Sequence, residues 1–121
     1  MTETRSILKD KSFAFALRCI KLYKYLSETK KEYILSKQLI RSGTSVGANI
    51  RESRNAETTP DFIHKMGIAQ KECDETLYWL ELLVESKYMN KVEFKSIYRD
   101  GEELLKILRS AILTTKQKKR R

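Results

Sequence analysis

The chain has 121 residues, of which 40% are hydrophobic and 34% charged, and its formal net charge is +9. This length fits one domain with a single core, and the composition is typical of an ordered, well-solvated protein. The chain has only four glycines and one proline, and these residues form the tight turns of all-β folds, so helices are predicted. No uncharged stretch approaches the roughly 18 apolar residues of a membrane span, and the first residues lack a signal-peptide pattern. We therefore expect a cytoplasmic protein with no membrane partner.

The first helix is predicted from about Asp10 or Ser12, either of which can cap it, to about Ser27. Apolar residues follow a helical repeat on one side, and a second stripe beside it widens the expected buried face. The first stripe is Phe15, Cys19, Leu22 and Leu26, and the second is Phe13, Leu17 and Ile20. Residues 28–31 form the first predicted turn.

The second segment, residues 32–56, allows two interpretations. Its middle, residues 41–49, reads Arg-Ser-Gly-Thr-Ser-Val-Gly-Ala-Asn, which is typical of a glycine-containing loop, for example one that binds phosphate. The known phosphate-loop patterns are absent, because neither Gly-x-Gly-x-x-Gly nor a Gly-Lys-Ser/Thr ending occurs. Apolar periodicity on both sides favours a helix whose small residues let a neighbouring helix approach closely.

The third and fourth helices have clear starts. Thr58 and Pro60 predict a capped helix that ends near Lys87 or Tyr88, and Asn90 with Glu93 predicts the cap of the next. Four amphipathic helices with short turns predict an all-α, antiparallel up-down-up-down four-helix bundle. We assign residues 1–115 to this single domain and residues 116–121 to a basic C-terminal tail. The expected buried lines are Phe62, Met66, Ala69, Cys73, Thr76, Leu80 and Leu83, then Phe94, Ile97, Gly101, Leu104, Leu108 and Ile112.

No catalytic or metal-binding set is apparent in the sequence. The single histidine, His64, cannot complete a ligand set of the kind found in di-iron bundles. Cys19 and Cys73 lie on apolar stripes and are expected to be small buried hydrophobes, and no base accompanies them as a nucleophile requires. We therefore predict no enzymatic activity, no cofactor and no metal.

Basic residues gather in two places. The tail contains Lys116, Lys118, Lys119, Arg120 and Arg121 with no acid, so it is either a polyanion contact or a solubilising helix end. A second group consists of Arg41, Arg51, Arg54 and Lys65. Arginine suits phosphate binding because its fork donates two hydrogen bonds, whereas nearby Glu52, Glu57 and Asp61 offer ion pairs instead. We predict both groups as nucleic-acid contacts.

An apolar surface is predicted outside the core. Tyr78, Trp79 and Leu82 fall partly off the buried stripe of the third helix. Aromatic residues are enriched at protein interfaces, so these three residues predict a subunit interface, and edge coverage of a small core is the alternative.

The middle of the chain resembles a known bacterial family. The run from Ser36 to Glu52, SKQLIRSGTSVGANIRE, is similar to the signature of proteins encoded within intervening sequences of large-subunit ribosomal RNA genes, and residues 61–80 resemble that family's third helix. Many members have Ile-Ala-Glu-Gly where this chain has Ile-Arg-Glu-Ser at residues 50–53, so Arg51 is an added cation.

The resemblance implies an antiparallel bundle that assembles as a homopentameric ring, with no established catalytic residues. It also implies a relation to the accessory protein of diversity-generating retroelements, whose basic surface engages nucleic acid and a reverse transcriptase. The expected partners are therefore copies of this chain, RNA or DNA, and a partner protein. The alternative hypothesis is a protein scaffold or accessory subunit without a direct nucleic-acid role.

Overall fold

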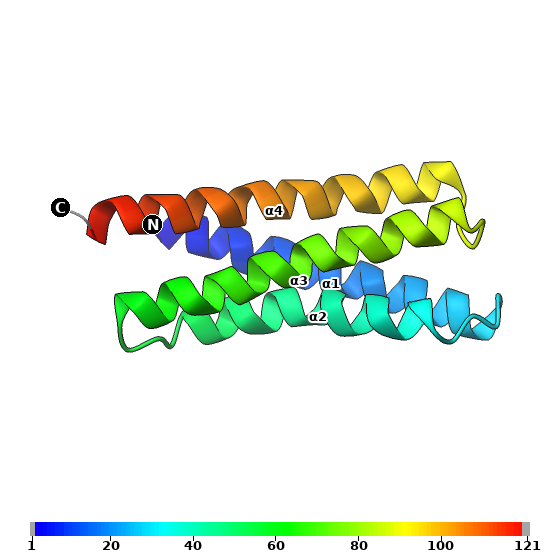
Figure 1. Cartoon of the computed structure of the whole chain (residues 1–121), viewed down its shortest axis with the longest axis horizontal. Helices are drawn as coiled ribbons and strands as arrows, with labels where there is room; N and C mark the ends of the chain where they lie inside the picture. The colour runs from blue at the N-terminus through cyan, green and yellow to red at the C-terminus, as the bar shows by residue number, and fades with distance from the viewer. Residues whose placement is uncertain (1, 120–121) are drawn as a thin grey trace.

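The computed structural model describes residues 2–119. Within them the chain forms four α-helices, α1 (Thr2–Glu28), α2 (Leu35–Ser53), α3 (Thr59–Glu85) and α4 (Lys91–Lys119). Each helix packs against the next and α4 packs against α1, whereas within the described residues no Cα atom of α1 comes within 8 Å of one of α3, and none of α2 comes within 8 Å of one of α4. Both termini and the α2–α3 loop lie at one end of the molecule (Figure 1). This arrangement confirms the predicted up-down-up-down bundle.

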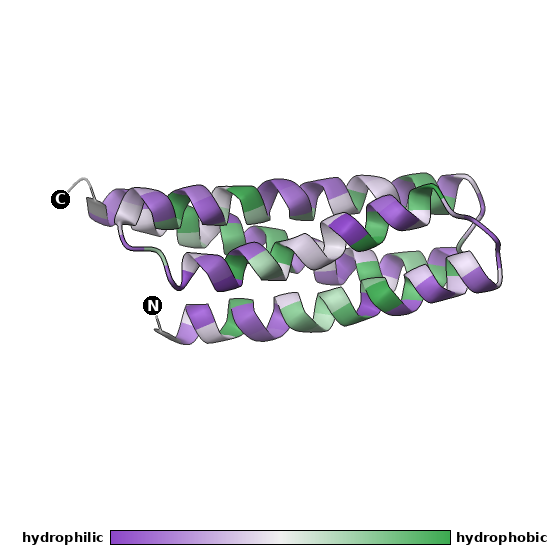
Figure 2. Cartoon of the chain, turned by 90° about the horizontal axis from the view of Figure 1, so that it is seen from below, coloured by the Kyte–Doolittle hydropathy of each residue, from purple (hydrophilic) through white to green (hydrophobic). Residues whose placement is uncertain are grey.

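One apolar core runs along the bundle. Hydrophobic residues recur along every helix between hydrophilic ones (Figure 2), as a side buried against the neighbouring helices requires. The predicted lines of α3 and α4 are buried almost throughout, and only Phe62 and Phe94 are half-buried. The fully buried side chains include Phe15, Leu26, Leu39, Leu80, Leu83 and Leu108.

Two predictions for α1 are wrong. The helix begins at Thr2 rather than at Asp10 or Ser12, because Leu8 adds a further turn to the core line and is buried. Ser12 is an interior residue of this helix whose hydroxyl donates to the carbonyl oxygen of Lys9. The second stripe does not widen the core, since Phe13 and Leu17 are 58% and 52% exposed.

Residues 41–49 are helical, so the helix prediction for this segment is confirmed and the loop interpretation is excluded. The reason is close packing. A β-carbon at position 43 would lie 2.9 Å from Cβ of Cys19, and one at position 47 would lie 3.3 Å from the hydroxyl oxygen of Ser12. Glycine at these positions therefore lets α2 approach α1, and this gain outweighs the low helix propensity of glycine.

The helix starts show one cap that sequence reasoning missed. The predicted caps are confirmed, because Thr58 accepts from the backbone N–H of Asp61 and Asn90 accepts from that of Glu93. The start of α2 is different. The buried carboxylate of Glu32 accepts from three backbone N–H groups, those of residues 34–36, and so satisfies most of the unpaired donors at this helix end.

Some predicted boundaries need correction. The third helix ends at Glu85 instead of Lys87 or Tyr88, since Lys87 adopts a left-handed backbone conformation, with φ 67°, that stops a helix. α4 continues to Lys119, so Lys116 and Lys118 lie on its last turns. None of the helices described is long and apolar enough to span a membrane.

Candidate nucleic-acid interface

Two of the predicted nucleic-acid contacts are engaged within the bundle. On α2, Arg41 forms ion pairs with Glu72, at 3.2 Å, and with Glu75, both on α3. Hydrogen bonding to Glu75 raises the pKa of Arg41 above its ordinary value. Lys65 of α3 lies 3.8 Å from the carboxylate of Glu52 on α2. Arg41 and Lys65 therefore join α2 to α3, and their charges are already opposed.

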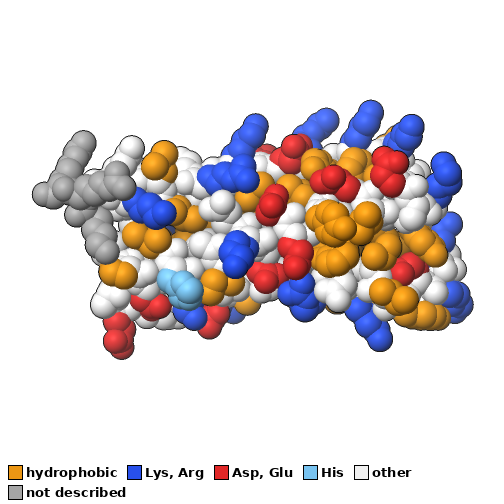
Figure 3. Space-filling model, in the orientation of Figure 1, with side chains coloured by type: hydrophobic (Ala, Val, Ile, Leu, Met, Phe, Trp, Pro, Cys, Tyr) orange, Lys and Arg blue, Asp and Glu red, His pale blue; other side chains and the backbone are white. Residues whose placement is uncertain are grey.

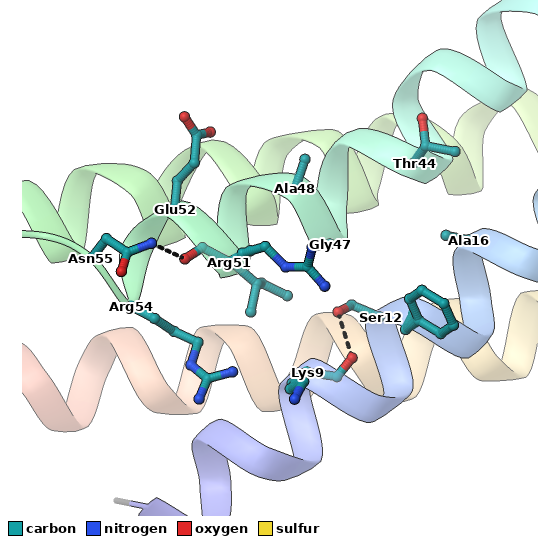
Figure 4. Close-up of a pocket in the computed structure, with 12 residues that line it drawn as sticks. Lys9, Ser12, Ala16, Thr44, Gly47, Ala48, Arg51, Glu52, Arg54 and Asn55 are labelled. Atoms are coloured by element: carbon teal, nitrogen blue, oxygen red, sulfur yellow. Dashed lines mark hydrogen bonds between the residues drawn. The ribbon is translucent and has the colours of Figure 1, made fainter.

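The other two arginines of α2 lie on a different side. Arg51 and Arg54 line an open groove of about 500 Å³ between α2 and α1, together with Lys9 of α1. Their guanidinium groups point toward the α1 side of the groove, whereas Glu52 points away from it (Figure 4). None of the ion pairs formed within residues 2–119 involves these three cations. We call Lys9, Arg51 and Arg54 the groove cations.

The local structure explains why these side chains converge. Arg51 and Arg54 are three residues apart at the end of α2, so they lie on neighbouring turns of one face. Gly47 precedes Arg51 by one turn and brings α2 close to Ser12, which places Lys9 opposite the arginines. The apolar part of the floor includes Ala16 and Ile50. The groove thus combines unopposed cations with an apolar base.

This arrangement suits an anion with repeated charges. Three exposed cations near one another repel, and a phosphate chain is a ligand that relieves the repulsion and releases its own counterions. The guanidinium groups can each donate two parallel hydrogen bonds to a phosphate. Glu52 is the one acid among the lining residues, and it points away from the groove (Figure 4) and lies 3.8 Å from Lys65.

The predicted tail residues are placed only in part. Lys116 and Lys118 are exposed on the last turns of α4, at the end of the bundle where α2 also ends (Figure 1). The side chain of Lys119 and all of Arg120 and Arg121 lie outside the described residues. Their contribution to the interface stays a prediction.

The predicted apolar surface is on α3. Tyr78 is 53% exposed, and its ring meets that of Trp79 edge-on at a centroid distance of 5.1 Å. Trp79 and Leu82 are half-buried. The indole N–H of Trp79 is buried without a hydrogen-bond partner among the described residues. Hydrophobic side chains form a visible cluster on the face shown in Figure 3.

The cysteine and histidine side chains lie in different environments. Burial raises the pKa of the Cys19 and Cys73 thiols to about 12, so both stay protonated and unreactive at neutral pH. His64 is exposed. Among the described residues, no group of three or more histidine, cysteine, aspartate or glutamate side chains is placed to hold a metal ion.

The fold and the small-residue helix place the chain in a known class of helical bundles. Residues 5–110 match the family described as 23S rRNA-intervening sequence protein. The chain belongs to this family.

A solved structure is also similar. It is the crystal structure of a protein of unknown function from the S23 ribosomal protein family of Bacteroides thetaiotaomicron, with 49% sequence identity and a TM-score of 0.89. The match covers 90% of this chain and 97% of that one. No curated protein matches.

Proposed function

We propose that this protein is a non-enzymatic, self-associating bundle that binds nucleic acid, RNA in preference to DNA, through basic side chains on its surface. The observation that carries the proposal is the set of groove cations, which have no acidic partner within residues 2–119. The net charge of +9 supports it, because a basic protein accumulates a polyanion at its surface. RNA is favoured over DNA because the family is described by an intervening sequence of 23S rRNA.

Self-association is supported by two separate apolar faces. One is formed by Phe13 and Leu17 on α1, and the other by Tyr78, Trp79 and Leu82 on α3. Because α1 and α3 are diagonal in the bundle, these faces are directed away from each other. Two different patches that meet between copies make a head-to-tail contact, which generates a closed ring when the rotation permits. The ring of five subunits implied by the family resemblance is of this kind.

The buried indole of Trp79 fits the same proposal. An N–H without an acceptor is unfavourable in an isolated bundle, and a rearrangement at a subunit contact would give it one.

Size-exclusion chromatography with light scattering tests the assembly directly. We expect Leu17→Glu to lower the oligomer to a monomer without loss of helicity, and Lys24→Glu, an exposed change on the same helix, to leave the oligomer intact.

A second candidate function is a protein scaffold or accessory subunit with no direct nucleic-acid role. The exposure of Phe13, Leu17 and Tyr78 favours it, since such faces also suit a different protein. This hypothesis predicts a stable assembly and only weak, nonspecific anion binding.

Fluorescence anisotropy of a labelled RNA across a salt series separates the two candidates. The full chain is compared with a chain truncated after Thr115, which removes the last basic residues. Under our proposal both bind, and affinity falls steeply with salt, because each phosphate contact releases counterions. Binding by neither chain near physiological salt would refute nucleic-acid binding and leave the scaffold. Binding that disappears with truncation would assign the contact to the basic end alone.

A further inference from the structure

The outward side of α4 carries a long row of cations. At 3.6 residues per turn, six basic residues of this helix fall within a sector of about 100°, and all six are exposed. In Figure 3, basic side chains follow one another along the upper edge of the molecule, where α4 runs in Figure 1. We call these residues the α4 basic stripe: Lys91, Lys95, Arg99, Lys106, Arg109 and Lys116.

The stripe differs from an ordinary solvated helix face, on which charges of both signs alternate. Glu102 is the one acid within its sector. Two other acids of α4 are directed toward α1, where Asp100 pairs with Arg18 at 2.6 Å and Glu103 pairs with Lys11. No ion pair within residues 2–119 includes a cation of the stripe.

This charge pattern is unfavourable for the helix itself. Lys91, Lys95 and Arg99 are spaced four residues apart, so like charges face each other on successive turns, which destabilises a helix. Lys91 is also the first residue of α4, where the helix dipole disfavours a cation. A charge placement that destabilises its own helix and has no compensating contact within the protein indicates a functional site.

We propose that the α4 basic stripe binds the phosphate backbone of double-stranded RNA. The inference rests on the proposed function for the choice of RNA, and it adds a surface distinct from the groove cations. From Lys91 to Lys116 the stripe spans roughly 37 Å, a length that can reach phosphates across successive grooves of an RNA duplex. A straight row of cations of this length can follow the phosphates of a duplex and carries no base-specific information.

Within the described part of α4, no exposed aromatic ring lies beside the stripe, and this favours a duplex over a single strand. Proteins that bind single strands stack the bases on exposed aromatic side chains. The aromatic residue at the edge of the described stripe is Tyr98, which is half-buried, contacts Phe94 and donates its hydroxyl to Glu81. Its ring is therefore held against the bundle.

The test compares two triple variants that remove the same charge. Lys95→Gln, Arg99→Gln and Lys106→Gln change the stripe, whereas Lys24→Gln, Lys37→Gln and Lys71→Gln change exposed lysines on the other three helices, none of which forms an ion pair within residues 2–119. Binding of the full-length proteins to a labelled RNA duplex is measured by anisotropy over a salt series. We expect the stripe variant to lose at least about tenfold in affinity and its salt slope to fall by roughly 2 to 3, and the control to stay within about twofold.

The outcomes separate this inference from the proposed function. Equal losses of RNA affinity in both variants would show that binding responds to net charge alone. This result would overturn the stripe as a binding site. Binding unchanged in the stripe variant but lost in Arg51→Gln/Arg54→Gln would also overturn it, while nucleic-acid binding stands. Failure of the unmodified protein to bind any RNA would refute the proposed function itself. Tighter binding to duplex DNA, to single-stranded RNA or to anionic vesicles would overturn the choice of double-stranded RNA.

A loss of folding cannot mimic the expected result. The stripe variant removes like-charge contacts, so its thermal midpoint is expected to equal or exceed that of the unmodified protein. Circular dichroism of both triple variants checks this. A stripe variant that binds weakly and also melts earlier would contradict the unfavourable charge pattern on which the inference depends.

Discussion

The two sides of α2 show how differently the same residue type is used. On the side facing α3, Arg41 is held by two glutamates and the hydroxyls of Ser42 and Thr76 lie 2.8 Å apart in the interior. On the side facing α1, Gly43 and Gly47 also let the two helices pack closely. Toward the end of the same helix, however, Arg51 and Arg54 face an open groove and have no ion-pair partner within residues 2–119.

This difference teaches that a cation's surroundings, rather than its presence in the sequence, decide what it can bind. An arginine that already pairs with carboxylates must exchange them for phosphate and gains little. An unopposed arginine gains the full interaction.

The largest expected effect is on the stability of the hydrophobic core. Leu80 of α3 is fully buried, so Leu80→Ala should reduce the free energy of unfolding by about 2–5 kcal/mol. Urea unfolding followed by circular dichroism measures this. Lys71→Ala, at an exposed position of the same helix, is the control. A loss below about 0.5 kcal/mol for Leu80→Ala would mean that this side of α3 is not the core.

The close approach of α2 to α1 predicts an intermediate effect. In Gly43→Ala the new β-carbon would meet Cys19 at 2.5 Å from Sγ and 2.9 Å from Cβ. This overpacking should reduce the free energy of unfolding by about 1–3 kcal/mol.

Gly67→Ala is the matched control, because a β-carbon there has no neighbour within 4 Å. It should instead stabilise the protein by up to about 1 kcal/mol through better helix propensity. Thermal or urea unfolding compares the two. Equal changes in both variants would contradict the packing explanation.

The cap at the start of α2 predicts a smaller, pH-dependent effect. Burial acts to raise the pKa of Glu32, but hydrogen bonds from the backbone N–H groups of residues 34–36 outweigh it, so the pKa lies below its ordinary value. The carboxylate therefore stabilises the fold above the unfolded-state pKa, and this contribution is lost as pH falls through the lower folded-state value.

Glu32→Gln should reduce the free energy of unfolding by about 1 kcal/mol at neutral pH. The difference from the unmodified protein should shrink as the pH falls below about 4. Urea unfolding at both pH values provides the measurement. A constant difference at both would show that the charge of Glu32 does not contribute.

The sequence predicted the bundle and the caps at Thr58 and Asn90 because these depend on local spacing. It could not predict the environment of α1. Two apolar stripes are present there and both were expected to be buried, but contacts with the other helices bury the stripe of Phe15 and leave Phe13 and Leu17 exposed. The cap by Glu32 lies in a loop and has no standard spacing.

The candidate site was predicted less completely for the same reason. Arg41 and Arg51 look alike in sequence, and their difference arises from glutamates more than 30 residues away from Arg41. The groove also needs Lys9, which lies far from Arg51 in sequence and was not predicted. The α4 basic stripe has a regular spacing, so a count of charges by helical face would have found it.

The most direct test of the account compares the two sides of α2 in RNA binding. Arg51→Gln/Arg54→Gln and Arg41→Gln/Lys65→Gln each remove two cations, and anisotropy over a salt series measures the affinity of each full-length variant. We predict that the groove variant loses about tenfold in affinity and roughly 2 in salt slope, whereas the variant of the paired cations stays within about twofold. Equal losses, or a larger loss for the paired cations, would contradict the claim that unopposed cations make the nucleic-acid contact.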